Sequence, residues 1–243
     1  MDEQRFHSYG YPLHEVLPTI DELARYLHAA DTEHPVYESM QRRLAQLHDC
    51  GATARGGYRI LPAQVDLQRG AVRAAGAELL TGAQVCGYMK EADRVALFVC
   101  TAGEIFTEIT HALNAEGDFL EAYVVDAIGS LTVERAMDNI QNELEREAAA
   151  QGLHISNRYS PGYCNWPLAG QQALFGAIGE HGTGVTLSPT SLMSPIKSVS
   201  GIIGIGPDVR RREYGCAVCN NKTCIYRKIV ARKNSIEIKK RAI

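Results

Sequence analysis

Arg94-Val-Ala-Leu-Phe-Val-Cys-Thr-Ala-Gly-Glu104 is the stretch of this sequence that decides the fold. Its first seven residues are almost continuously apolar, which is typical of a buried strand. The following Thr-Ala-Gly-Glu segment is expected to turn the chain into a helix that runs to about Asn114. The stretch therefore predicts a buried strand that leads directly into a helix.

The composition is typical of a globular protein with a full core. The chain has 243 residues, of which 45% are hydrophobic and 22% charged. No segment approaches the roughly 18 uninterrupted apolar residues of a membrane helix, and the polar start Met1-Asp-Glu-Gln-Arg-Phe-His7 does not resemble a secretory signal. We therefore expect a cytoplasmic location, where the seven cysteines would be thiols or metal ligands and not disulfides.

The periodic segments predict an α+β domain. Thr19-Ile-Asp-Glu22 is similar to a capping box and predicts a helix from 19 to 30. Apolar spacing predicts further helices over 37–47 and 120–150. Strands are expected over 56–65, 184–188 and 198–205. Helices first and strands later favour one α+β domain over residues 1–243, with 210–243 as a C-terminal extension of the same domain.

The C-terminal extension is strongly basic. From Arg210 to Ile243 there are eleven Lys or Arg residues and two acids, in a chain whose net charge is −3. One interpretation is a solvated tail. The other is a docking surface for an acidic partner, either nucleic acid or an acidic protein.

The predicted helix over 120–150 presents two different faces. One stripe, at spacings of three and four, contains Tyr123, Ala127, Ser130 and Glu134. A separate apolar stripe, expected to pack into the core, contains Val133, Met137, Ile140 and Leu144. Glu134 thus lies at the boundary of the buried face, either as a solvated glutamate or as a carboxylate that faces a polar or cationic ligand group.

Stiff and aromatic residues are concentrated in Arg158-Tyr-Ser-Pro-Gly-Tyr-Cys-Asn-Trp-Pro167. Proline fixes φ and restricts the preceding residue, so Ser160-Pro-Gly162 is expected to form a tight turn that holds Arg158 and Tyr163 in a fixed relation. A guanidinium is suited to binding a carboxylate or phosphate, and an aromatic ring offers a flat surface to a base or a cation. The alternative is a structural loop with an aromatic anchor.

Further on, glycines alternate with β-branched residues over 201–207, which predicts a strand with close backbone approach.

Four short motifs resemble, in the same order, the activation domain of cobalamin-dependent methionine synthase. Arg158-x-Ser-Pro-Gly-Tyr163 resembles its Arg-x-Ala-Pro-Gly-Tyr loop, and Pro195-x-x-Ser-Val-Ser-Gly201 resembles its Pro-x-x-Ser-Val-Ser-Gly strand. Val99-Cys-Thr-Ala-Gly103 is similar to its Val-Thr-Gly-Gly turn, and Glu134 stands where its long helix has a glutamate. The resemblance implies a curved, mainly antiparallel sheet flanked by helices.

The resemblance also implies an S-adenosylmethionine site. The matching ligand contacts are Arg158, Ser160, Tyr163 and Glu134, and a further family tyrosine corresponds to Tyr214 at a different spacing. The arginine would bind the methionyl carboxylate, the glutamate a cationic or hydrogen-bond-donating part, and the rings the flat or apolar parts. The implied process is reductive methylation, in which Co(II) cobalamin takes up an electron and S-adenosylmethionine supplies the methyl group that restores methylcobalamin.

Two family elements have no counterpart in this sequence. One is an Asp-Trp ligand element near the start of the domain, and the other is the Asp-x-His-x-x-Gly cobalamin-binding motif. We therefore expect a free-standing reactivation module whose cobalamin belongs to another chain, a cobalamin-binding methyltransferase subunit. In that role, the basic extension is expected to dock the corrinoid protein or an acidic electron donor such as a flavodoxin or ferredoxin, and not nucleic acid.

Cys216-x-x-Cys219-x-x-x-x-Cys224 is an addition to the family pattern. Three thiolates at this spacing can hold Zn(II) or an iron–sulfur cluster, or they can remain unligated. A closed zinc site needs a fourth ligand, for which Cys164 is the first candidate and His181 the second. Three further cysteines lie in helix or strand patterns and are expected in the core: Cys50, Cys86 and Cys100.

These cysteines and the basic extension leave a second function open. The chain would then be a metal-stabilised binding module that docks nucleic acid or an acidic protein through its basic tail. Salt-dependent nucleic-acid binding without S-adenosylmethionine binding would favour this alternative.

Overall fold

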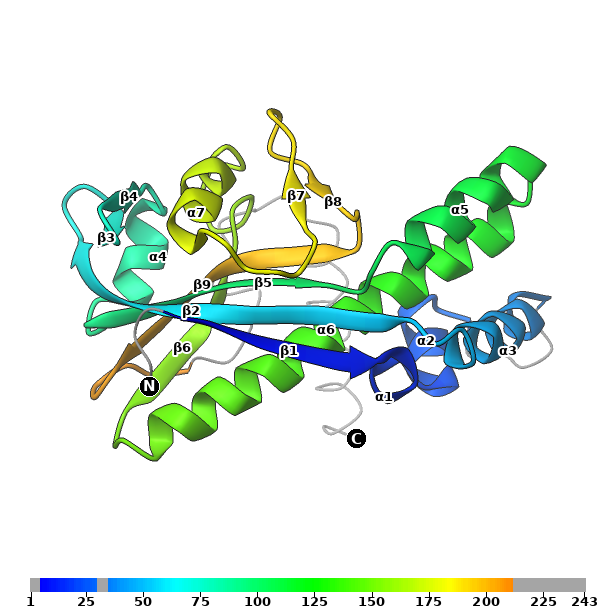
Figure 1. Cartoon of the computed structure of the whole chain (residues 1–243), viewed down its shortest axis with the longest axis horizontal. Helices are drawn as coiled ribbons and strands as arrows, with labels where there is room; N and C mark the ends of the chain where they lie inside the picture. Colours follow the sequence, from blue (N-terminus) through cyan, green and yellow to red (C-terminus); the bar gives the residue numbers. More distant parts are fainter. Residues whose placement is uncertain (1–4, 30–34, 212–243) are drawn as a thin grey trace, which may run out of the picture. The chain divides into compact units, whose positions relative to one another are not determined.

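The structure is a computed structural model that describes residues 5–29 and 35–211 (Figure 1). The described residues through Arg210 form one compact unit. Its strands are β1 (Phe6–Pro12), β2 (Thr53–Asp66), β3 (Ala71–Ala74), β4 (Ala77–Leu79), β5 (Arg94–Thr101), β6 (His154–Tyr159), β7 (Thr186–Leu187), β8 (Met193–Ser194) and β9 (Ser198–Gly206). Its helices are α1 (Leu13–Val16), α2 (Ile20–Tyr26), α3 (Pro35–His48), α4 (Gly82–Tyr88), α5 (Ile105–Glu116), α6 (Phe119–Ala149) and α7 (Gly170–Ile178).

An antiparallel sheet organises this unit. Its strand order is β4-β3-β2-β5-β9-β6, and β1 pairs with the first part of β2. The last residues of β2 pair with β3, and Figure 1 shows β2 bending where it leaves the other strands for this hairpin. β7 and β8 form a separate two-stranded pair. The α+β class and the mainly antiparallel sheet flanked by helices are thus confirmed.

Strand β5 lies at the centre of the sheet and is buried on both faces. Phe98 and Cys100 belong to a core with α6 and the N-terminal helices, and we call this side the α6 face. Leu97 and Val99 belong to a second core with α4 and α7, on the α7 face. In Figure 1, α6 runs along one side of the sheet and α4 and α7 lie on the other. Burial on both faces explains why the sequence of β5 lacks an apolar–polar alternation.

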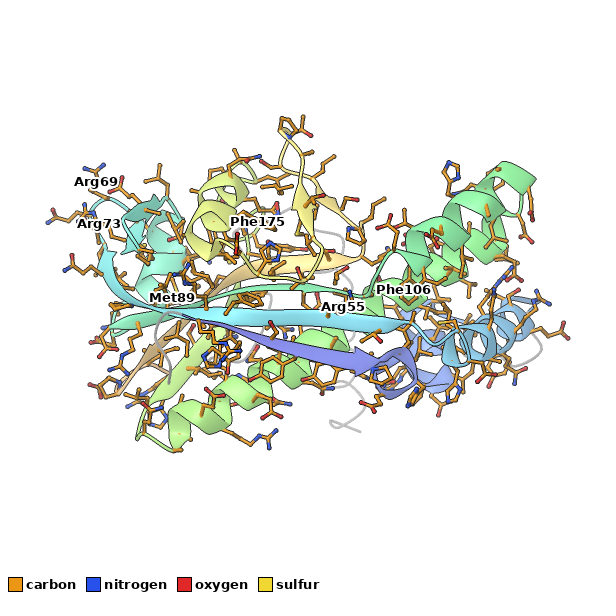
Figure 2. All side chains as sticks on the ribbon, in the orientation of Figure 1. Arg55, Arg69, Arg73, Met89, Phe106 and Phe175 are labelled. Carbon is orange, nitrogen blue, oxygen red and sulfur yellow. The ribbon has the colours of Figure 1, made fainter. Side chains whose placement is uncertain are left out.

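The long helix α6 provides the backbone of the α6 face. The Asp118 side chain caps it by accepting a hydrogen bond from the Glu121 N–H at 3.2 Å. The predicted apolar stripe is confirmed, because its four members are at most 4% exposed: Val133, Met137, Ile140 and Leu144. Gly129 has a packing role, since a Cβ there would lie 2.8 Å from Lys197 Cγ and 2.9 Å from the Phe106 ring. Figure 2 shows Phe106 where α5 begins beside the sheet.

The expected elements form in their expected order along the chain, but further elements were not predicted. The Thr19 capping box is present, and the strand expected over 94–100 and the helix over 120–150 are β5 and α6. However, β1 and β6 were not predicted, and strands and helices are interspersed along the chain, so the description of helices first and strands later is wrong. β1 was not predicted as a strand, because it contains Gly10 and Pro12, which are typical of turns. β6 lacks a regular strand alternation in the sequence, because its pairing with β9 shifts between Ile155 and Arg158.

The cysteine predictions are confirmed for two residues and wrong for one. Cys86 and Cys100 are buried in the core, as expected. Cys50 is exposed because it lies beyond the end of α3, where its thiol donates a hydrogen bond to the Leu47 carbonyl oxygen at 3.0 Å.

Two further expectations concern the whole chain. Within residues 5–29 and 35–211 no helix combines the length and apolar character needed to cross a membrane. Almost all of the basic extension over 210–243 lies outside the described residues, so its place in the same domain stays a prediction.

Gly129→Ala is expected to destabilise the protein, although alanine normally stabilises a helix interior. The new methyl group would force Lys197 or the Phe106 ring to move, and overpacking costs about 1–3 kcal/mol. Alanine gains only about 0.5–1 kcal/mol of helix propensity. Urea unfolding followed by circular dichroism would measure the free energy of unfolding, which we expect to fall.

Gly176→Ala is the matched control, because Gly176 is an exposed glycine of α7 whose added Cβ would meet nothing within 4 Å. This variant should be more stable than the wild type. Equal stabilisation by both substitutions would contradict the close packing at Gly129.

Candidate functional site

Two separate sets of ion pairs lie along one stripe of α6, and we call them together the ion cluster. Its members are Asp126, Glu134, Asp138, Arg158 and Lys197. Arg158 Nη2 lies 3.0 Å from Glu134 Oε2, and Arg158 Nη1 lies 2.8 Å from Asp138 Oδ1. Lys197 Nζ lies 2.6 Å from Asp126 Oδ1. The cluster therefore joins α6 to β6 and to the segment before β9.

The cations lie deeper than the carboxylates. The side chains of Arg158 and Lys197 are 19% and 13% exposed. Those of Asp126, Glu134 and Asp138 are 51%, 55% and 61% exposed. A ligand that approaches from solvent therefore meets the carboxylates first, with the positive charge beneath them.

The strand register places Arg158 on the α6 face. Arg158 pairs with Ile203 of β9, a residue of the core on the α6 face. The next residue, Tyr159, pairs with Ile202 and belongs to the core on the opposite face. Because neighbouring side chains of a strand point to opposite faces, Arg158 is directed at α6.

Lys197 is held by its backbone as well as by its side chain. Its carbonyl oxygen accepts a hydrogen bond from the Ala102 N–H at 2.8 Å, just after β5. Its ammonium group donates to Ser130 Oγ at 3.0 Å. Gly103, in the turn that follows, has a φ of +99°, which favours glycine and lets the chain enter α5. The Val-Cys-Thr-Ala-Gly103 turn thus helps to position the ion cluster.

Burial, and to a smaller extent the charges of the ion cluster, shift the pKa values of Glu134 and of the neighbouring Cys100 thiol. Burial raises the pKa of Glu134 above its ordinary value, the Arg158 guanidinium opposes this, and Asp138 raises it further. With 55% of the Glu134 side chain exposed, water screens both charge effects. Burial raises the pKa of the Cys100 thiol to about 12, with Arg158 lowering it and Glu134 raising it. Cys100 therefore remains a neutral thiol beside the ion cluster.

The loop after Arg158 forms the predicted tight turn and has the predicted aromatic anchor. The Gly162 N–H donates to the Trp166 carbonyl oxygen at 2.8 Å, and the Tyr163 N–H donates to the Ser160 carbonyl oxygen at 3.1 Å. Trp166 is 1% exposed and anchors the loop in the core on the α7 face, whereas Tyr163 is 72% exposed. The loop is therefore anchored by its tryptophan and leaves its tyrosine ring available to a ligand.

Ser160 lies where the backbone comes closest to β9. A Cβ built on Gly201 would meet the Tyr159 carbonyl oxygen at 2.2 Å and Ser160 Oγ at 2.9 Å. Only glycine leaves room for this contact, as the glycine-rich strand predicted.

The structure brings together some of the predicted ligand residues. Glu134 and Arg158 form an ion pair, and Ser160 follows Arg158 at the end of β6. The Tyr163 hydroxyl makes no hydrogen bond to another residue in the part of the chain that the structure describes. Tyr214 lies outside the described residues, so its role stays a prediction.

The predicted metal site also stays a prediction. Its main ligands lie outside the described residues: Cys216, Cys219 and Cys224. Cys164 is partly buried against the core on the α7 face. His181 Nδ1 lies 2.8 Å from Thr183 Oγ1. Within residues 5–29 and 35–211 no group of three or more potential ligands is arranged to hold a metal ion.

Sequence reasoning missed three members of the ion cluster: Asp126, Asp138 and Lys197. The two aspartates were detectable, because they continue the Ser130–Glu134 stripe at four-residue intervals on α6. Lys197 was not detectable from the sequence, because its approach to α6 depends on how the segment before β9 packs against Gly129.

Residues 84–228 match the family described as vitamin B12 dependent methionine synthase, activation domain, which is more than half of the chain. The chain belongs to this family. The crystal structure of the MetH reactivation domain bound to AdoHcy is similar to this activation domain, with a TM-score of 0.54 and 17% sequence identity. The match covers 87% of this chain and 81% of that chain, and at this identity it shows a common fold. No curated protein sequence matches this activation domain.

The thiol of Cys100 is expected to resist alkylation in the native activation domain. At pH 8 a thiol with a pKa of about 12 is almost entirely protonated, and thiolate is the reactive form. Exposed Cys50 is the internal reference. After a short treatment with iodoacetamide, peptide mass spectrometry should find Cys50 modified and Cys100 unmodified. Equal modification of the two would show that Cys100 is not buried beside the ion cluster.

Proposed function

We propose that this chain binds S-adenosylmethionine and acts as a reactivation module for a cobalamin-dependent methyltransferase of the methionine synthase type. The observation that carries the proposal is the Arg158–Glu134 ion pair, which joins the proline-stiffened loop to the long helix in a member of the activation-domain family. The AdoHcy bound in the similar MetH structure supports it, because AdoHcy is the product that S-adenosylmethionine leaves after methyl transfer.

The residues at the ion cluster suit the groups of this ligand. Each terminal nitrogen of Arg158 carries two N–H groups. The guanidinium can therefore bind the methionyl carboxylate while it also faces its present partners, Glu134 and Asp138. The carboxylate of Glu134 can accept hydrogen bonds from the methionyl ammonium group. Ser160 offers a hydroxyl group, and the exposed ring of Tyr163 offers a flat surface for the adenine. In this proposal the ring of Tyr214 offers a second one.

The chemistry requires a methyl acceptor on another chain. When bound on its partner subunit, reduced cobalamin supplies the electron pair that takes up the methyl group, and the ligand sulfur keeps the electron pair of the broken bond. The residues of this chain bind and orient the methyl donor. The basic extension would dock the corrinoid subunit or an acidic electron donor such as a flavodoxin or ferredoxin, in the cytoplasm.

Arg158→Ala is expected to weaken S-adenosylmethionine binding at least tenfold. A hydrogen bond to a charged group is worth about 1.5–3 kcal/mol, and a tenfold change corresponds to about 1.4 kcal/mol. Isothermal titration calorimetry at fixed salt would measure the Kd. Arg146→Ala is the matched control, because Arg146 is 71% exposed and pairs with Glu143 on the same long helix, away from the ion cluster.

Wild-type protein that shows no binding at millimolar ligand would remove the proposed function. Equal affinities of the wild type and Arg158→Ala would remove the assigned site.

A further inference from the structure

The ion cluster carries more negative than positive charge. Counted over the described residues alone, it contains three carboxylates and two cations, which give a formal charge of −1. Lys197 and Asp126 balance each other, whereas Arg158 faces both Glu134 and Asp138. Neighbouring Cys100 adds no charge, because its thiol is protonated. Because the proposed function assigns Glu134 to the methionyl ammonium group, Asp138 is the carboxylate in excess.

The excess charge is directed toward solvent and not buried. Asp138 is 61% exposed, while the Arg158 guanidinium that holds it is 19% exposed. The charge of Arg158 holds Asp138 Oδ1 at 2.8 Å from Nη1, and a carboxylate with two oxygens can face another cation as well. A structural ion pair of the usual kind would need only one carboxylate for one guanidinium.

S-adenosylmethionine and its demethylated product differ in charge. The donor carries a sulfonium, an ammonium and a carboxylate group, with a net charge of +1. Transfer of the methyl group leaves a neutral thioether and a net charge of zero. A site with one surplus negative charge attracts the donor more strongly than the product.

We propose that Asp138 is a specificity-determining residue that makes this site prefer the sulfonium donor to the thioether product. The inference rests on the proposed function and adds the basis of discrimination at the same site. Loss of the sulfonium charge on methyl transfer weakens the attraction to Asp138, which favours exchange of the product for a new donor molecule.

Asp138→Asn tests this proposal, because it removes the charge and keeps an oxygen that Arg158 can bind. The measured quantity is the ratio of two Kd values, for S-adenosylhomocysteine over S-adenosylmethionine, by calorimetry on the full chain. Since Asp138 is largely exposed and screened, we expect the ratio to fall about two- to fivefold. The fall should come from weaker binding of S-adenosylmethionine, with the affinity for S-adenosylhomocysteine unchanged or higher.

Two further variants separate charge from structure. Asp138→Glu keeps the charge and should keep the wild-type ratio. Glu143→Gln removes a carboxylate of α6 that pairs with Arg146 outside the ion cluster, and it should also leave the ratio unchanged. Thermal unfolding of each variant shows whether it is folded.

The outcomes distinguish this inference from the function on which it rests. Wild type that binds neither compound would overturn the proposed function and the inference together. A different result would overturn only the role of Asp138. In that case the wild type binds S-adenosylmethionine, and the two Kd values of Asp138→Asn are unchanged or change by the same factor. A ratio lowered in Asp138→Asn and retained in Asp138→Glu would support it.

Discussion

The attraction between the carboxylates of α6 and two largely buried cations is the constraint on which the site depends. A guanidinium or ammonium group removed from water is costly unless carboxylates pair with it. Arg158 and Lys197 come from the ends of different sheet segments, and both are satisfied by the same stripe of α6. Together with the buried apolar stripe, the pairing therefore positions α6 along the sheet and directs its carboxylates toward β6 and the segment before β9.

Close backbone packing makes this pairing geometrically possible. Gly129 lets the stem of Lys197 and the Phe106 ring approach α6, and Gly201 lets the end of β6 cross β9. Gly56 lies against Cys100 and Ile140, since a Cβ there would be 2.7 Å from atoms of both. These glycines bring helix, sheet and loop closer together than larger residues would allow. The short separation gives α6 carboxylates access to cations on the sheet.

The sequence predicted this architecture where a signal was local. The capping box at Thr19, the apolar run of β5 and the apolar stripe of α6 each depend on neighbours in the chain, and each is confirmed. β6 was missed because a bulge interrupts its period. Arg158 and Glu134 could be assigned together only through the resemblance to a family. Their separation of 24 residues carries no geometric information until β6 is placed beside α6.

The remaining part of the site illustrates the same limit. Asp138 follows Glu134 by one helical turn, so the spacing of the two carboxylates was visible in the sequence. Their common role was not visible, because it depends on the two terminal nitrogens of Arg158, one of which lies near each carboxylate. Lys197 had no local signal at all. Electrostatic complementarity between distant segments is a property of the folded chain, and residue types alone do not show which charges will meet.

A crystal structure of the chain with S-adenosylmethionine tests the central claim most directly. The account predicts ligand density between the Arg158–Tyr163 loop and α6, with the methionyl carboxylate within hydrogen-bond distance of Arg158 and the ammonium group beside Glu134. Ligand density at another surface of the unit, with the ion cluster unchanged and untouched, would contradict it.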